Sequence, residues 1–144
     1  MIIPDVSKLI HAYNSDSPQH AAARAWWEET LAGPRPVGMA WVVLLGFIRI
    51  ITNRGIFDNP MRASEATRRV EAWLAHTRVL IVTPGDRHGE VLFRLLNQLG
   101  VAGNLTTDAH LAALAIEYQA EVASTDTEFA RFKGLRWYNP LGRK

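Results

Sequence analysis

The chain has 144 residues, a hydrophobic content of 48% and a formal net charge of +2. These values fit a single core, and we expect residues 1–144 to form one domain. The absence of cysteine excludes disulfides, thiolate zinc sites and cysteine nucleophiles. The longest apolar stretch, residues 38–48, is much shorter than the roughly 20 residues of a membrane helix. Asp5 and Lys8 interrupt any signal-peptide core. We therefore expect a soluble, cytoplasmic protein that does not associate with membranes.

Apolar spacing and turn residues divide the chain into alternating elements. In chain order, the sequence predicts a strand at 2–4, helices at 6–13 and 18–33, a loop at 34–36, helices at 41–52 and 63–75, a strand at 79–82, helices at 87–99 and 108–118, a strand at 121–124, a helical turn at 128–132 and an edge strand at 135–138. Ser17 and Pro18 are typical of a helix start. The β-branched residues of 41–52 also permit a strand, but its length favours a buried helix. Helices alternating with short strands predict an α/β fold with a parallel sheet covered on both faces.

Three aspartates stand at or beside the ends of apolar segments. Asp5 and Asp126 follow predicted strands, and Asp108 opens a predicted helix. In an open α/β sheet, ligands bind outside the carboxyl ends of the strands, so these side chains are expected to meet. Carboxylates that close repel one another unless they are protonated, paired or bound to a cation. Mg²⁺ prefers such oxygen ligands, which points to phosphodiester hydrolysis at a site formed by the three aspartates.

Each aspartate also fits an ordinary role as a helix cap, so the prediction depends on all three occurring together. Ser7 and Thr125 adjoin two of them, and we expect their hydroxyls to orient the carboxylates or ligand waters. The sequence contains no glycine-rich phosphate loop, no H-E-x-x-H motif and no G-x-S-x-G motif. For His110, a surface position and a substrate contact both remain open.

Five arginines fall within one third of the chain and fit either phosphate contacts on one face or ordinary surface ion pairs. These are Arg49, Arg54, Arg62, Arg68 and Arg69.

Four segments, in order, resemble the PIN-domain ribonucleases, specifically the VapC toxins of bacterial toxin–antitoxin pairs. They are residues 2–13, 41–53, 107–115 and 124–141. The resemblance implies a PIN-like three-layer α/β/α fold with a short parallel sheet. It also implies a Mg²⁺-dependent endoribonuclease, with Mn²⁺ as a possible substitute, that cleaves cellular RNA. In that family Asp5, Asp108 and Asp126 match the acidic positions. The implied partners are a cognate VapB-like antitoxin and a second copy in a homodimer.

One position departs from the family pattern. Many members carry a glutamate where this chain has Gly46, which removes one charge and one possible ligand. Glu128 is either a substitute or a surface residue, and Arg49 fits either a phosphate contact or a pair with an aspartate. Two other functions therefore stay open: a PIN domain that binds RNA or antitoxin without efficient cleavage, and a hydrolase of another phosphate ester. We further expect an antitoxin helix to lie in an apolar groove formed by Trp26, Trp27, Leu31 and Trp41.

Overall fold

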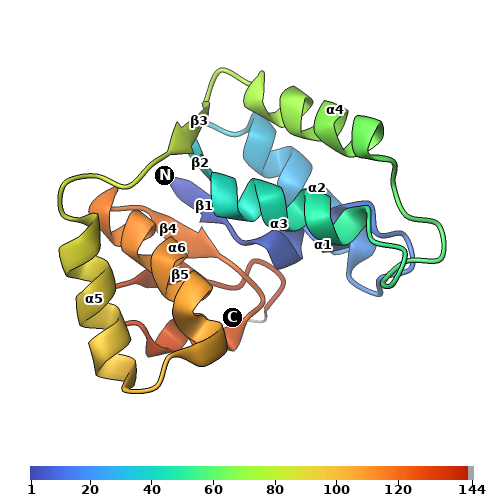
Figure 1. The fold of residues 1–144 in the computed structure, drawn as a ribbon. Helices are drawn as coiled ribbons and strands as arrows, with labels where there is room; N and C mark the ends of the chain where they lie inside the picture. Colours follow the sequence, from blue (N-terminus) through green and yellow to red (C-terminus); the bar gives the residue numbers. More distant parts are fainter. Residues whose placement is uncertain (143–144) are drawn as a thin grey trace.

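The computed structural model describes residues 1–142, and this part contains a parallel sheet of five strands in the order β3-β2-β1-β4-β5 (Figure 1). The strands are β1 Ile2–Pro4, β2 Val37–Ala40, β3 Val79–Val82, β4 Glu121–Ala123 and β5 Arg136–Tyr138. Strand β1 lies at the centre, and β5 lies at an edge as predicted. Every residue of β1 and β2 is buried, which is expected of strands covered on both faces.

The helices within the described residues are α1 Val6–Tyr13, α2 His20–Ala32, α3 Trp41–Ile51, α4 Ala63–Leu74, α5 His88–Leu99 and α6 Thr106–Glu117, with short 3-10 helices η1 Gly103–Leu105 and η2 Thr127–Arg131. Strands β2 and β3 lie on one side of β1, whereas β4 and β5 lie on the other. The right-handed crossovers from β1 to β2 and from β2 to β3 run in one direction and place α1 to α4 on one face of the sheet. The crossover from β3 back to β4 runs in the opposite direction and places α5 and α6 on the other face (Figure 1). The predicted three-layer α/β/α architecture is confirmed.

Strand β2 was not predicted from the sequence. It is only four residues long, and its last residue, Ala40, is also the N-cap of α3, so no turn residue separates the two elements. Gly38 allows the strand to lie between its neighbours: a Cβ atom there would be 2.7 Å from Val82 Cγ1 and 2.9 Å from Met1 Sδ. The prediction failed because the apolar run continues unbroken from the strand into the helix.

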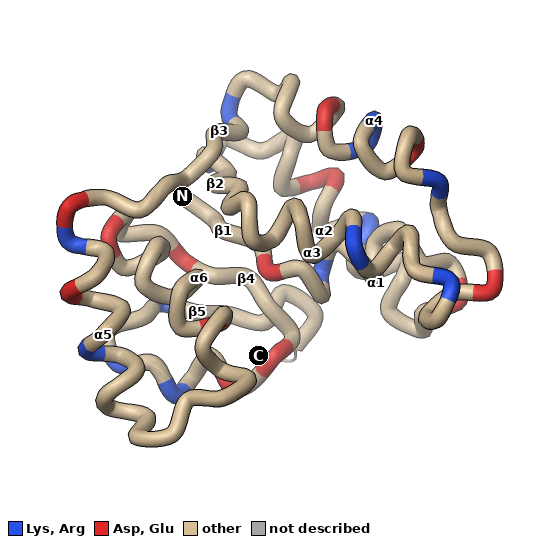
Figure 2. Tube along the Cα trace, viewed as in Figure 1, with Lys and Arg blue, Asp and Glu red and all other residues tan. Residues whose placement is uncertain are grey.

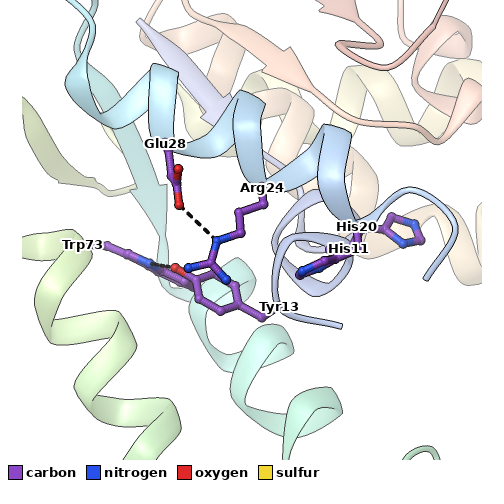
Figure 3. Close-up of polar contacts among 6 residues, drawn as sticks. All are labelled: His11, Tyr13, His20, Arg24, Glu28 and Trp73. Carbon is purple, nitrogen blue, oxygen red and sulfur yellow. Dashed lines mark hydrogen bonds and ion pairs between the residues drawn. The ribbon is translucent and has the colours of Figure 1, made fainter. Parts of the chain in front are cut away.

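Helix α2 begins at His20, two residues later than the predicted start at Pro18. The Ser17 hydroxyl does not cap the helix; it accepts a hydrogen bond from Gln19 N at 3.1 Å and lies 2.7 Å from His11 Nδ1. The His20 ring in turn lies 2.9 Å from the His11 carbonyl oxygen (Figure 3). These contacts fix the turn between α1 and α2 and delay the start of the helix.

An aromatic cluster joins the helices on the α1–α4 face. The ring centroids of Phe47 and Trp73 are 4.8 Å apart, and those of Trp27 and Trp73 are 5.5 Å apart. Trp73 Nε1 donates a hydrogen bond to Tyr13 Oη at 3.0 Å (Figure 3). Trp27 is only 1% exposed. Trp27 therefore does not line an antitoxin groove as expected, because its side chain is core; a groove formed by Trp26, Leu31 and Trp41 stays a prediction.

No helix in residues 1–142 combines the length and the hydrophobicity that crossing a membrane requires.

Candidate active site at the carboxyl ends of β1 and β4

The chain reverses its direction across the sheet between β1 and β4, which are paired neighbours with Pro4 opposite Ala123. Ligands of open α/β sheets bind beyond the carboxyl ends of the strands at such a reversal. Asp5 follows β1 directly, and Asp126 lies three residues beyond the end of β4. The topology therefore places both side chains at the same edge of the sheet.

Asp5 is held in a fixed orientation by hydrogen bonds to both carboxylate oxygens. Its Oδ1 accepts from Val6 N at 2.7 Å, so Asp5 is the N-cap of α1. Its Oδ2 accepts from Ser124 Oγ at 2.8 Å and from Ser7 Oγ at 3.4 Å. The residue is 8% exposed. Burial raises the pKa of the Asp5 carboxyl, the nearby Asp126 charge raises it further, and these hydrogen bonds oppose the rise.

Ser124 links two of the aspartates and was missed in the sequence analysis. Besides donating to Asp5, its Oγ accepts a hydrogen bond from Asp126 N at 3.0 Å. The side chain is fully buried. A signal was present in the sequence, since Ser124 is the first polar residue after an apolar strand and stands two positions before an aspartate. Ser7 and Thr125, the two predicted supporting hydroxyls, also contact each other: Thr125 Oγ1 donates a hydrogen bond to Ser7 Oγ at 3.3 Å.

Asp108 lies in the first turn of α6, on the other side of the site. Burial raises the pKa of its carboxyl to about 6, and the charges of Asp5, Asp126 and Glu128 raise it as well. The four carboxylates therefore share one electrostatic environment. No ion pair to Asp108 forms within the described part of the chain, so nothing there offsets this repulsion.

Glu128 lies at the surface, and its charge also acts on the site. Its backbone N donates to Asp126 Oδ1 at 2.9 Å, which makes Asp126 the N-cap of η2. Its carboxylate accepts from Arg131 at 3.0 Å in a half-exposed ion pair, yet its charge still acts on Asp108. That Glu128 substitutes for the glutamate absent at Gly46 stays a prediction.

A cavity of about 600 Å³ adjoins the carboxylates between α3 and α6. Asp5, Asp108, Thr107 and Arg49 are its polar lining residues, and Gly46 also borders it. The rest of the wall is aliphatic and consists of Val6, Val42, Val43, Leu45, Ile48 and Leu111. Arg49 thus reaches the site, unlike Arg68 and Arg69 of α4, which contact Ser64 and Glu65 within their own helix.

His110 faces away from this cavity and packs between α5 and α6. Its Nδ1 lies 2.9 Å from Nε2 of the buried His88. Burial and the neighbouring His88 lower the pKa of His110. His110 therefore contributes to the packing of α6 against α5. Neither sequence-based prediction, a surface position or a substrate contact, described this role.

The carboxylates do not form a closed metal cage. Among residues 1–142, no three His, Asp or Glu side chains are grouped closely enough to enclose a metal ion. This differs from the expected convergence of three oxygens on one ion. Mg²⁺, however, usually keeps several water ligands and binds one or two carboxylates directly. These clustered carboxylates, of which Asp5, Asp108 and Asp126 form no ion pair within the described residues, are a donor set that fits such a hydrated ion.

Comparison with known proteins identifies the family. The PIN domain family model matches residues 2–135. Ribonuclease VapC33 of Mycobacterium tuberculosis is 43% identical over 141 residues, which cover 98% of this chain and 99% of that protein. Ribonuclease VapC37 of the same species is 41% identical over 140 residues, which cover 97% of each chain.

Solved structures share the fold at much lower identity. The crystal structure of M. tuberculosis VapC20, described as a sarcin-ricin loop cleaving toxin, aligns with a TM-score of 0.62 at 18% identity over 94% of this chain and 99% of that one. VapBC-1 from nontypeable Haemophilus influenzae aligns with a TM-score of 0.68 at 19% identity over 99% and 100%. The family match and the close relatives confirm the resemblance seen in the sequence: the chain belongs to the PIN domain family, among the VapC-type ribonucleases.

Proposed function

We propose that this protein is the toxin of a toxin–antitoxin pair and that it cleaves RNA internally with the help of a divalent metal ion. The observation that carries the proposal is the cluster of carboxylates at the β1/β4 reversal: burial, and then the charges of Asp5, Asp126 and Glu128, raise the pKa of Asp108, and no ion pair to Asp108 forms within residues 1–142. The ribonuclease names of relatives above 40% identity support the same activity.

Asp5, Asp108 and Asp126 would hold the ion, which is Mg²⁺ or Mn²⁺. When bound, a divalent ion activates water and neutralises charge on the phosphate. Asp5 is suited to anchor it because hydrogen bonds from Val6, Ser7 and Ser124 fix its carboxylate. Asp108 supplies a carboxylate with no ion pair among the described residues, so its oxygens remain open to the ion or its waters.

The supporting residues act through these acids. Ser124 holds Asp5 and the backbone of Asp126 together, and Thr125 steadies Ser7. Arg49 lines the cavity beside the acids, where its guanidinium is suited to a phosphate oxygen of the RNA.

The proposed partners are a cognate antitoxin, RNA and a second copy of the chain. Structural neighbours are described as VapBC assemblies, in one case bound to promoter DNA, which supports an antitoxin partner. Co-expression with the small protein encoded beside the gene, followed by size-exclusion chromatography with light scattering, tests both the antitoxin and the homodimer.

The activity is tested by incubating purified protein with total RNA in Mg²⁺, in Mn²⁺ and in chelator. Internal cuts that require the metal are the expected result. Asp5→Asn should abolish them with little change in fold, because the substitution removes the charge and keeps the volume. Asp58→Asn is the matched control, since Asp58 is an exposed acid outside the site. Full activity of Asp5→Asn would contradict the anchoring role.

A second function is favoured by the glycine at position 46 and by the absence of a closed three-donor group in residues 1–142. In that case the protein binds RNA or antitoxin and does not cleave efficiently. Tight RNA binding without cuts in either metal would support it. Hydrolysis of a small phosphate ester while RNA stays intact would instead indicate a hydrolase of another substrate class.

A further inference from the structure

We propose that the cavity between α3 and α6 holds a nucleotide adjoining the cleaved phosphodiester, with its base between aliphatic side chains and its next phosphate at Arg49. The inference rests on the proposed ribonuclease function and adds a substrate subsite to it. Asp5 and Asp108, two of the proposed metal-binding acids, form part of the cavity wall. A phosphodiester bound at those acids places one of its two nucleotides in the adjoining space.

The size and lining of the cavity suit a nucleotide. Its volume of about 600 Å³ falls within the range typical of small-molecule sites, roughly 300–1,000 Å³. Burying the apolar face of a base against aliphatic side chains does not require a particular base, so this wall favours binding of any base. Gly46 keeps the space open: a Cβ atom there would lie 3.3 Å from Val6 Cγ2, and a longer side chain would take up part of the cavity.

The charges favour RNA over a protein segment. Helix α3 carries a single basic residue, Arg49, in its last turn, and Figure 2 shows the distribution of basic and acidic residues along the chain. No ion pair to Arg49 forms within residues 1–142. An RNA strand presents a phosphate to this guanidinium while the adjacent diester faces the acids and their ion. A basic protein segment that neutralised the acids would instead meet Arg49 with a like charge.

Leu45 and Trp41 provide a matched pair of positions for the test. Both lie on α3, one turn apart, with exposures of 60% and 52%, so neither substitution removes core packing. Leu45 lines the cavity, whereas Trp41 is not among its lining residues. The substrates are a short RNA spanning a mapped cut and two versions with an abasic ribonucleotide on one or the other side of that cut.

For the wild type, one of the two abasic substitutions should lower kcat/KM roughly tenfold, as expected when the apolar surface of one base is no longer buried. Leu45→Ala should lower cleavage of the natural RNA and bring this ratio closer to one, because the removed side chain and the base interact in the proposed complex. Trp41→Ala should keep the wild-type ratio. Equal cleavage of natural and abasic RNA by the wild type, or the same behaviour of both variants, would overturn the inference while leaving the ribonuclease function intact.

Two further outcomes separate the alternatives. If no RNA is cut in Mg²⁺ or Mn²⁺, no cut can be mapped, and the proposed function and the subsite that rests on it both fail. If Leu45→Glu abolishes binding of the protein encoded beside the gene, while the abasic ratio for RNA is unchanged, the cavity belongs to a protein partner and the inference is wrong. Phe93→Glu is the control for the added charge, because Phe93 is 62% exposed and does not line the cavity.

Discussion

Replacing Lys8 with methionine is expected to stabilise the protein at neutral pH. Lys8 lies on α1, its side chain is 0% exposed, and its Nζ has no hydrogen-bond partner among residues 1–142. The amine instead lies over the Trp26 ring, 5.3 Å from the centroid. Burial lowers the pKa of Lys8 from its ordinary value of 10.5 to about 8. The charged form is therefore less favourable in the folded protein than in the unfolded chain.

The size of the effect follows from this pKa. A pKa lowered by about 2.5, at about 1.4 kcal/mol for each pH unit, corresponds to a cost of about 3 kcal/mol. The contact with Trp26 offsets about 1 kcal/mol of it, which leaves a net cost of about 2 kcal/mol. Methionine has a similar length, no charge and enough flexibility to fill the same space. For a chain of 144 residues, a gain of about 2 kcal/mol corresponds to a rise in melting temperature of about 7 °C.

The pH dependence distinguishes a charge effect from better packing. Below pH 8 the amine is protonated in both states and the full cost applies. Between pH 8 and 10.5 the folded protein loses the proton first, so wild-type stability rises and the advantage of the variant shrinks.

Urea unfolding of wild type and Lys8→Met at pH 7 and pH 9.5 measures this change. Lys133→Met, which replaces an exposed lysine, serves as the control. A variant that is less stable at pH 7, or equally favoured at both pH values, would refute the reasoning.

Three further predictions concern the site and the sheet. Ser124→Ala should cost roughly 1–3 kcal/mol of unfolding free energy, because it leaves buried polar groups unsatisfied, and should weaken Mg²⁺ binding in calorimetric titration. The pKa of Asp108 is raised, so this carboxyl stabilises the metal-free protein at pH 4 and loses that contribution as pH rises through about 6. Asp108→Asn should thus raise the melting temperature at pH 7.5 without metal, and Mg²⁺ should raise it in the wild type alone. Gly38→Ala should cost roughly 1–3 kcal/mol in urea unfolding through overpacking, whereas Gly89→Ala on exposed α5 should cost nothing.

Local sequence patterns determined most of the helices and the chain positions of the acids. The apolar repeats of α1, α3, α4 and α5 span at most a dozen residues, so their bounds can be read without knowing what they pack against. Asp5 and Asp126 were found in the same way, because each follows a short apolar run.

Tertiary structure alone decided which of these residues meet. The hydrogen bond between Ser124 and Asp5 joins residues 119 positions apart, and it exists because β1 and β4 pair in the sheet. The burial of Lys8 and the contact of His88 with His110 likewise depend on neighbouring helices. Periodicity is a property of one segment, whereas desolvation and repulsion between carboxylates are set by every segment packed around a group. The sequence thus determined that the chain carries the acids, and only the packed fold decided how they share a site.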